Sequence, residues 1–349
     1  MKICYVINHI DVEKCGTTIT LMKKMYDRGH NVYVMNVGDF CLKSNFTMSV
    51  HTIHFPKKLK VDSDEAFLEK MQSGDLKKST VDVSEFDVMF IRNNPTEEGK
   101  ERHWAEKAGI SFGRIVEQMG VLVLNDAYAM TNSFVDKLYF EEFPEEIKPD
   151  SIVTREKEEL MKFYKDHKNQ MVLKPLEGSG GQNVYFIDKN EKNTNQIIDT
   201  ILAEGYVIAQ QYLPDVSKGD VRILLMNGRV LEQDGEKALV LRKSMEGEFR
   251  NNLTQGGSAG KAAFTPEMEH IVNVVSPKLI RDGHFFVGLD VVGDKLIEIN
   301  VLSPGGLRSF PKIGLPDFAE SVVDAIERKV EYKKIYKGQL SNKVLATMH

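Results

Sequence analysis

Apolar runs and helix-like spacing alternate over the first third of the chain. Residues 3–7 form a strand-like run, residues 18–28 repeat apolar positions at helical spacing, and residues 31–35 are again strand-like. This order predicts a doubly wound parallel sheet, in which ligands bind beyond the carboxyl ends of the strands. The apolar run 87–91 ends at Arg92, so Arg92 is a candidate anion contact. The alternative is an ordinary surface arginine at a strand end.

The same patterns divide the chain into four parts. We expect an N-terminal substrate domain at 1–125, a small α+β unit at 126–205, a second α+β unit at 206–330, and a basic, partly disordered tail at 331–349. Residues 57–86 are charged and poor in apolar side chains, which favours a surface excursion. A helix is expected to begin near Asn132 or Ser133, either of which can cap it.

Two apolar runs surround Gly293-Asp294, and this indicates a β-hairpin. Each run carries one acid among residues that favour burial, Asp290 in the first and Glu298 in the second. A buried carboxylate is costly unless a cation or another partner neutralises it. Two solvated acids near a turn are the simpler interpretation, but the apolar setting and the glycine-rich segment that follows argue against it.

The length of the hairpin loop decides whether the two acids share a face. A two-residue loop would place Asp290 and Glu298 on opposite faces, whereas a three-residue loop from Gly293 to Lys295 would pair them. We expect the three-residue loop. Asn300 then joins the same face, because it lies two residues beyond Glu298. Three hard oxygen ligands on one face predict a Mg²⁺ site that also holds phosphate oxygens.

Composition narrows the functional classes. The chain has 349 residues, of which 42% are apolar and 28% charged, as in ordinary globular proteins of two or three domains. A net charge of −5 argues against a general nucleic-acid surface. No apolar run approaches the roughly 20 residues that span a bilayer. The start lacks a signal-peptide pattern, and three cysteines without metal spacing are expected as reduced thiols, so we expect a cytoplasmic protein.

A lysine at the end of the strand-like run 171–175 precedes a glycine-rich turn. The lysine is Lys174, and the turn is Gly178-Ser179-Gly180-Gly181. Glycines let backbone N–H groups approach phosphate oxygens, and lysine supplies a compact positive charge. Such a turn alone is usually only a turn. With a metal site expected downstream, we interpret it as a loop that covers phosphates.

Further polar positions follow this turn. The strand-like segment 206–213 can lay backbone groups along an adenine edge, and it ends in Gln210-Gln211-Tyr212-Leu213. After it, Asp220 can bind a ribose hydroxyl and Arg222 a phosphate, and Arg242 follows another apolar run. The glycine-rich stretch 246–260 has the character of a lid and contains Arg250-Asn251-Asn252.

The order of these motifs resembles the ATP-grasp superfamily and, within it, the bacterial glutathione synthetases. The resemblance covers about residues 1–330. It is carried by Leu-Lys-Pro-Leu-Glu-Gly-Ser-Gly-Gly at 173–181, Ala-Gln-Gln-Tyr-Leu-Pro at 209–214, Gly-Asp-Val-Arg at 219–222, Phe-Val-Gly-Leu-Asp at 286–290 and Glu-Ile-Asn-Val-Leu-Ser-Pro at 298–304. It implies an α/β protein with the ATP-grasp fold, in which an N-terminal doubly wound parallel-sheet domain precedes two α+β subdomains that clamp ATP.

The resemblance also implies roles for individual residues. ATP would be held by Lys137, Lys174, Gly178, Ser179, Gly180, Gly181, Gln210, Gln211, Tyr212, Leu213 and Asp220. Mg²⁺, or Mn²⁺ in its place, would be held by Asp290, Glu298 and Asn300. The γ-phosphate and the activated carboxylate would meet Arg222, Arg242, Arg250 and Asn252. The small-molecule substrate would lie near Arg92, Ser303, Gly305 and Gly306.

The implied reaction joins a carboxylate to an amine through an acyl phosphate, with ADP and phosphate as products. In glutathione synthetases the carboxylate belongs to γ-glutamylcysteine and the amine to glycine. Phosphoryl transfer calls mainly for positioning and charge neutralisation, which lysines, arginines and Mg²⁺ supply. The reaction also calls for lids that exclude water from the acyl phosphate, and the glycine-rich stretches suit that task.

The sequence departs from the family's usual pattern at the substrate end. The departures are Ile7-Asn8-His9-Ile10, Asn93-Asn94-Pro95-Thr96 and Ser303-Pro304-Gly305-Gly306. Three functions therefore stay open: a glutathione synthetase, an ATP-grasp ligase for another peptide or amino-acid pair, and an ATP-binding regulatory protein without turnover. The intact lysine, arginine and acid set argues against the third. The sequence does not decide the substrates, whether a homo-oligomer forms, or the roles of the tail and of Cys4, Cys15 and Cys41.

Overall fold

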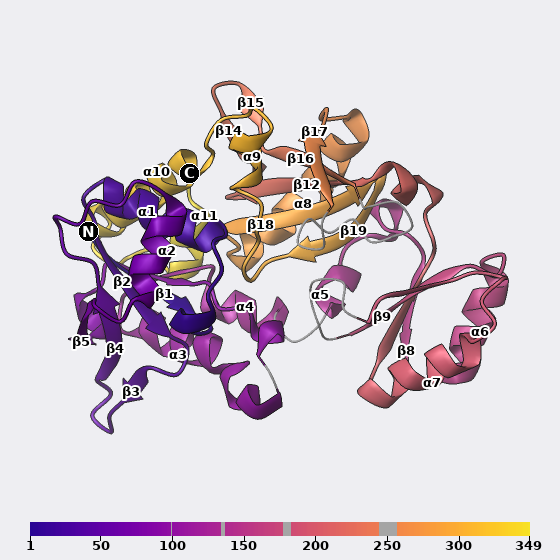
Figure 1. The fold of residues 1–349 in the computed structure, drawn as a ribbon, viewed down its shortest axis with the longest axis horizontal. Helices are drawn as coiled ribbons and strands as arrows, with labels where there is room; N and C mark the ends of the chain where they lie inside the picture. The colour runs from indigo at the N-terminus through magenta and orange to yellow at the C-terminus, as the bar shows by residue number, and fades with distance from the viewer. Residues whose placement is uncertain (99, 134–136, 177–182, 244–256) are drawn as a thin grey trace.

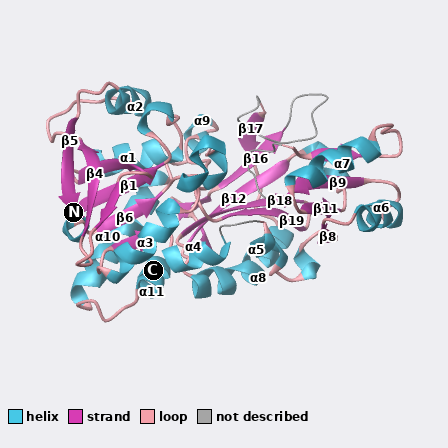
Figure 2. Ribbon diagram, turned by 90° about the horizontal axis from the view of Figure 1, so that it is seen from below, coloured by secondary structure: helices cyan, strands magenta, loops and turns pink. Residues whose placement is uncertain are grey.

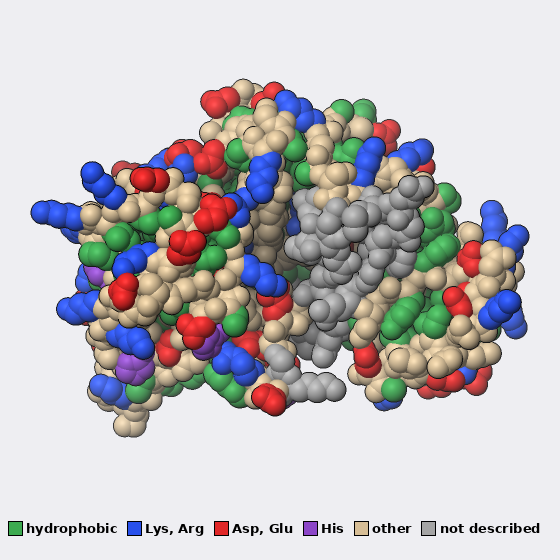
Figure 3. Space-filling model, in the orientation of Figure 1, with side chains coloured by type: hydrophobic (Ala, Val, Ile, Leu, Met, Phe, Trp, Pro, Cys, Tyr) green, Lys and Arg blue, Asp and Glu red, His purple; other side chains and the backbone are tan. Residues whose placement is uncertain are grey.

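The computed structural model describes residues 1–98, 100–133, 137–176, 183–243 and 257–349. In Figure 1 the chain forms three units side by side: an N-terminal unit that also holds both termini, a central unit built on a long sheet, and a small unit at the opposite end. Side chains of both charges are interspersed on the face drawn in Figure 3, so the net charge of −5 is not concentrated on that face.

Within the described residues, the N-terminal unit contains a seven-stranded sheet in the order β3-β4-β2-β1-β6-β7, with β5 beside β4. β2, β1, β6 and β7 run parallel, which confirms the parallel core that the sequence predicts, while β3, β4 and β5 add an antiparallel edge. The strands are β1 (Lys2–Ile7), β2 (Asn31–Asn36), β3 (Phe40–Leu42), β4 (Met48–His54), β5 (Lys77–Asp82), β6 (Val88–Ile91) and β7 (Leu122–Leu124).

Helices cover both faces of this sheet, because successive residues of its strands point to opposite sides. Ile3 and Tyr5 of β1 belong to a core shared with α1 and α10, whereas Cys4 and Val6 belong to a second core shared with α3 and α4. These helices are α1 (Thr17–Asp27), α3 (Ala108–Gln118), α4 (Ala127–Ser133) and α10 (Ala319–Ile335). The predicted helix start at Asn132 or Ser133 is wrong, since both residues lie within α4, which begins at Ala127.

The expectation of a surface excursion at 57–86 is also wrong. α2 (Asp64–Gln72) begins after Ser63, whose hydroxyl accepts a hydrogen bond from the Ala66 amide, and β5 then pairs with β4. Phe67 and Met71 of α2 are buried. Two buried apolar side chains, in a helix with four charged residues among nine, give too weak a period for the sequence pattern to reveal.

The tail at 331–349 is folded, in contrast to the predicted partial disorder. α10 extends to Ile335, and α11 (Asn342–Thr347) follows it. The Asn342 side chain accepts from the Val123 amide at 2.7 Å and donates to the Val123 carbonyl at 2.9 Å, while Leu345 and Ala346 are buried. The tail is therefore attached to β7 of the N-terminal unit.

The small unit is an antiparallel four-stranded sheet, β10-β9-β11-β8, over the described ranges. Its elements are β8 (Ser151–Thr154), α6 (Lys157–Asp166), β9 (Met171–Pro175), β10 (Tyr185–Ile187), α7 (Thr194–Glu204) and β11 (Val207–Gln210), with α5 (Leu138–Glu141) before it. β11 belongs to this sheet although the expected boundary at 205 would separate it. The domain boundaries themselves stay predictions.

The central unit is a six-stranded sheet within the described residues, in the order β17-β16-β12-β18-β19 with β13 beside β12. Its strands and its long helix are β12 (Asp220–Met226), β13 (Arg229–Val230), β16 (Leu239–Lys243), β17 (Ser258–Lys261), α8 (Pro266–Asp282), β18 (Phe286–Val292) and β19 (Lys295–Asn300). Figure 2 shows α8 along one side of this sheet, where Ile271 and Val275 share a core with Ile223 and Leu289. The opposite face carries the polar residues of the candidate site together with Leu224 and Val240, which belong to the first core.

Shorter elements connect these units. They are β14 (Glu232–Gln233), β15 (Glu236–Lys237), α9 (Ser309–Lys312) and the 3₁₀ turns at Ile10–Val12, Val83–Glu85, Pro95–Glu97, Lys100–Ala105, Glu145–Ile147 and Pro214–Lys218. A search of the described helices for one long and apolar enough to cross a membrane finds none.

Candidate active site

The hairpin formed by β18 and β19 brings the two predicted acids together, but by a different route. Val292 pairs with Lys295, so the loop has two residues, and the predicted three-residue loop is wrong. A bulge at Ile297 then shifts the register, and Asp290 pairs with Glu298 as predicted. A bulge adds one residue to one strand, so it restores the face that a two-residue loop would have reversed.

A row of charged residues crosses the sheet face that points away from α8. Asp220 of β12 pairs with Arg242 of β16, and Arg222 of β12 pairs with Asp290 of β18. Cross-strand partners share a face, and so do residues two apart in one strand. The row therefore continues through Asp290 to Glu298 on β19.

Asp290 is the centre of this row and is 1% exposed. Arg222 donates to both of its carboxylate oxygens, with Nη2 2.7 Å from Oδ2, and Arg242 Nη2 lies 2.9 Å from Oδ2. Burial acts to raise the pKa of Asp290, but the charges of the two arginines outweigh it and hold that pKa below its ordinary value. Asp290 thus fixes both guanidinium groups in place.

At Asp220, unlike Asp290, burial outweighs the neighbouring positive charges in its effect on the pKa. Arg242 donates to the Asp220 carboxylate through Nε and Nη2 at 2.6 and 2.9 Å. Burial, together with the nearby charge of Asp290, raises the pKa of Asp220 to about 6. The predicted ribose contact through Asp220 stays a prediction, and its carboxylate is already shared with an arginine.

Two lysines lie within range of the charge of Glu298. Lys137 Nζ donates to the Pro175 carbonyl at 2.7 Å, and Lys174 Nζ donates to Gln210 Oε1 at 2.7 Å. Burial lowers the pKa of Lys137 to about 8 and also lowers that of Lys174, while the charge of Glu298 favours the protonated form of both. The charge of Glu298 thus offsets only part of the cost of burying the two ammonium groups. A bound phosphate would supply the further negative charge that they lack.

The donor set at the hairpin fits a hard cation. Over the described part of the chain, the Glu298 side chain makes no hydrogen bond or ion pair, and Asn300 Nδ2 is buried without a partner. A carboxylate offers about four lone-pair positions, and the arginines use three at Asp290. Glu298, Asn300 Oδ1 and one position on Asp290 can therefore serve Mg²⁺, which prefers oxygen ligands.

The predicted substrate residues gather beside the row. Arg92 Nε donates to Thr18 Oγ1 at 3.1 Å and Nη2 to the Pro304 carbonyl at 3.0 Å, while Ser303 Oγ donates to the Arg92 carbonyl at 3.0 Å. Arg222 Nη1 is 3.4 Å from the Gly305 carbonyl. The loop at 303–306 thus joins Arg92 of the N-terminal unit to the charged row.

This loop depends on a glycine. Gly306 has φ +127°, a conformation that L side chains rarely adopt, and its amide donates to Thr17 Oγ1 at 3.0 Å. Thr17 and Thr18 lie at the start of α1, and neither was predicted from the sequence. The rule that singled out Arg92, namely position after a strand of a parallel sheet, applies equally to the residues after β1.

The remaining residues predicted to bind adenine lie at the end of β11 and just after it. Gln211 exchanges hydrogen bonds with Asp150, the Tyr212 ring lies 4.2 Å from that of Phe186 between centroids, and Leu213 precedes a 3₁₀ turn. Their adenine contacts stay predictions. Gly178, Ser179, Gly180, Gly181, Arg250 and Asn252 lie outside the described residues.

Two of the loops that depart from the family's usual sequence, after β1 and after β6, are joined by hydrogen bonds. The sequence did not reveal this contact. Asn8 Nδ2 donates to the Asn94 carbonyl at 2.7 Å and to Glu98 Oε1 at 2.8 Å, and the Asn94 amide donates to Asn8 Oδ1 at 2.6 Å. Arg102 Nε lies 2.7 Å from Glu98 Oε2. The departures after β1 and β6 therefore form one structural unit.

Comparison with known proteins shows the family to which this chain belongs. A model described as the N-terminal domain of prokaryotic glutathione synthetase matches residues 1–130, and one described as its ATP-grasp domain matches residues 136–313. The glutathione synthetase of Vibrio vulnificus (strain YJ016) is 31% identical over 330 residues, 93% of this chain and 96% of that protein. That of Gloeobacter violaceus is 30% identical over 347 residues, 96% and 98% of the two chains.

Solved structures support the fold. The D-cycloserine synthetase DcsG aligns with a TM-score of 0.63 at 13% identity, covering 93% of this chain and 100% of that one. The ATP-grasp ligase PsnB, complexed with a phosphomimetic variant of its minimal precursor, Mg and ADP, aligns with a TM-score of 0.59 at 16% identity, covering 94% and 98%. Fold, motifs and relatives agree: the chain belongs to the prokaryotic glutathione synthetase family and is an ATP-dependent ligase with the ATP-grasp fold.

Proposed function

We propose that this protein is a glutathione synthetase, which joins the cysteine carboxylate of γ-glutamylcysteine to the amine of glycine and converts ATP to ADP and phosphate. The observation that carries the proposal is the charged row on one sheet face, next to the loop that joins it to Arg92. Relatives named glutathione synthetase cover nearly the whole chain and support the same conclusion.

The chain's own side chains suit an acyl phosphate route. The substrate carboxylate attacks the γ-phosphate of ATP, and the glycine amine then attacks the acyl carbon and displaces phosphate. Lys137 and Lys174 would hold the phosphates, and Arg222 and Arg242 would meet the charge that develops during transfer. Because carboxylates already orient both guanidinium groups, little reorganisation is needed, and such a preorganised donor is worth roughly 3 kcal/mol in comparable acyl chemistry.

Mg²⁺ held by Glu298, Asn300 and Asp290 would supply positive charge to the phosphate oxygens. An acyl phosphate exposed to water would hydrolyse, so the reaction calls for a cover over the site. The glycine-rich stretches expected to supply it, 178–181 and most of 246–260, lie outside the described residues.

The direct test is Mg²⁺-dependent ADP release with γ-glutamylcysteine, measured with and without glycine. We expect strong release only with both substrates, together with a product of the mass of glutathione. ADP release that is independent of glycine would contradict the proposed ligation.

A second candidate is an ATP-grasp ligase for another peptide or amino-acid pair. It is favoured by the bonded loops at Asn8 and Asn94, since both depart from the family's usual sequence and they contact each other. ATP binding without turnover of γ-glutamylcysteine and glycine would favour this candidate, and a screen of other dipeptides and amino acids would follow.

A further inference from the structure

The carboxyl ends of β1 and β6 form the natural ligand crevice of the N-terminal sheet. The chain leaves β1 for β2 on one side, while β6 lies on the other side, so the strand order reverses between β1 and β6. In open α/β sheets, ligands bind at such a switch point. Glu13 lies in the connection from β1 to α1, and Arg92 directly follows β6.

Arg92 is 4% exposed and is held on two of its three nitrogens, by Thr18 and Pro304. Its Nη1 is buried and has no hydrogen-bond partner among the residues that the structure describes. Burial lowers the pKa of Arg92 to about 10, so the guanidinium is still charged at neutral pH. A buried, charged N–H without an acceptor is costly, and it indicates that an anionic acceptor from a ligand completes this residue.

Glu13 supplies a carboxylate to the same crevice, because it lies in the connection that leaves the carboxyl end of β1, next to β6. Burial raises the pKa of Glu13 to about 7, and the charge of Arg92 acts in the other direction, so the two groups interact. The backbone of Lys14 also acts to lower this pKa, and the Glu13 side chain forms no ion pair within 4 Å in the described part of the chain. Glu97 lies close enough to add a second negative charge. A cation is therefore favoured next to Glu13.

We propose that Glu13 binds the α-ammonium group of the substrate's γ-glutamyl head while Arg92 Nη1 binds its α-carboxylate. This inference rests on the proposed function and names the residue that selects the free amino-acid head. A guanidinium beside a carboxylate matches the two charges of a zwitterion. Arg92 contacts Pro304 and Arg222 contacts Gly305, so one short loop connects the head site to the arginine that would meet the reacting carboxylate.

Glu13 would contribute to substrate specificity, because peptides without the α-amino group would bind less well. A substrate that lacks the ammonium would leave the half-buried Glu13 carboxylate unpaired, and sites built around a substrate's polar group discriminate strongly against analogues without it. Neutral or acylated heads should therefore be poor substrates, although their reacting carboxylate is identical.

The test compares Glu13→Gln with the wild type on γ-glutamylcysteine and on glutarylcysteine, which differs only by lacking the amino group. With γ-glutamylcysteine, we expect the variant to lose about 10- to 100-fold in kcat/KM, as for a hydrogen bond to a charged group. With glutarylcysteine, the wild type should already be poor, and the variant should lie within about 2-fold of it. Glu331→Gln on the exposed side of α10 is the matched control, and KM for ATP should be unchanged in all proteins.

An equal loss on both substrates would overturn the role of Glu13 and leave the proposed function standing. A second measurement needs only the wild type: turnover of N-acetyl-γ-glutamylcysteine as fast as of γ-glutamylcysteine would overturn the inference even if the variant failed to fold. Absence of wild-type turnover with γ-glutamylcysteine and glycine would instead contradict the proposed function, and the inference with it.

Discussion

Two carboxylates of one cross-strand pair have different surroundings at the residue scale. Asp290 is buried between Arg222 and Arg242, whereas Glu298 is half-buried and without a polar partner over the described ranges. The first is a structural counter-ion that also borders the proposed cation site. The second is free to bind. Substitution of the two residues should therefore have separable effects on stability and turnover.

Asp290→Asn should lower the free energy of unfolding by about 3 kcal/mol, because it leaves two buried guanidinium groups poorly paired. Glu298→Gln should change that free energy by less than about 1 kcal/mol but lower kcat at least ~100-fold by weakening the cation site. Urea unfolding and Mg²⁺-dependent ADP release measure the two effects. Wild-type turnover in Glu298→Gln would refute the metal assignment.

Lys329 gives a prediction for pH. It is fully buried, and its Nζ donates to Asn227 Oδ1 at 2.8 Å and to the Met348 carbonyl at 2.6 Å. Burial lowers the pKa of Lys329 to about 7, while an unfolded lysine keeps its ordinary value near ~10.4. Between these values the unfolded chain binds more protons, so the stability contributed by this group rises with pH.

We therefore expect the stability of the wild type to rise between pH 7 and pH 9 by roughly 2 kcal/mol relative to Lys329→Met. Methionine has a similar volume and does not titrate. Urea unfolding of both proteins at the two pH values gives the difference. Parallel pH profiles would show that Lys329 stays protonated in the folded protein.

At the scale of elements, the sequence revealed that Asp290 pairs with Glu298 in the hairpin of β18 and β19, but not the geometry of that hairpin. The requirement that both acids lie on one face gave the correct partner for Asp290. The chain meets this requirement with a two-residue loop and a bulge at Ile297 in place of a three-residue loop. A bulge leaves no mark in a run such as Leu296-Ile297, where both residues are apolar. Similarly, α2 and α11 each rest on two or three buried side chains, too few to set a helical period. Tertiary packing decides such elements.

The bulge predicts an asymmetry between two single-residue deletions. Deletion of Ile297 should keep at least a tenth of wild-type turnover, because the residues on either side keep their present partners. Deletion of Ile299 should abolish turnover, because it moves Asn300 to the opposite face. ADP release by the two deletion variants, with circular dichroism as the check on folding, compares them. Equal activity would mean that Asn300 is not a ligand.

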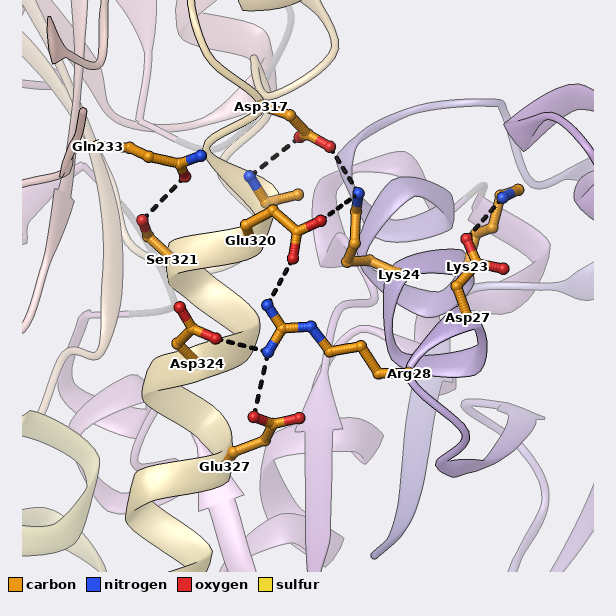
Figure 4. A network of polar contacts seen from close by, with 11 residues as sticks. Lys23, Lys24, Asp27, Arg28, Gln233, Asp317, Glu320, Ser321, Asp324 and Glu327 are labelled. Carbon is orange, nitrogen blue, oxygen red and sulfur yellow. Dashed lines mark hydrogen bonds and ion pairs between the residues drawn. The ribbon is translucent and has the colours of Figure 1, made fainter.

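At the scale of the whole molecule, an ion network fastens the C-terminal helix to the N-terminal unit. Arg28, directly after α1, contacts Glu320, Asp324 and Glu327 of α10, and Lys24 of α1 contacts Asp317 and Glu320 (Figure 4). The parallel core of the N-terminal sheet was predictable from local patterns of strands and helices. This long-range return was not, because no local pattern says which distant surface a helix covers.

Arg28→Gln should lower the free energy of unfolding by about 1 kcal/mol, since these side chains are partly exposed and the network is screened by solvent. Lys23→Gln, which loses only the pair with Asp27 inside α1, should cost less than about 0.5 kcal/mol. The difference between the variants should shrink in 1 M NaCl because salt screens exposed charges. A difference that is independent of salt would assign the loss to packing of the Arg28 stem.

The return of α10 and α11 also has a consequence for biosynthesis. One core joins Ile3, Tyr5 and Phe90 of the first strands to Val322 and Leu345, near the other end of the sequence. Before α10 and α11 have been synthesised, the part of this core that they supply is missing, and the apolar side chains that they cover are exposed. The first sheet therefore completes its core only after the small and central units have been synthesised, so the N-terminal unit cannot finish folding before the units that follow it in the sequence.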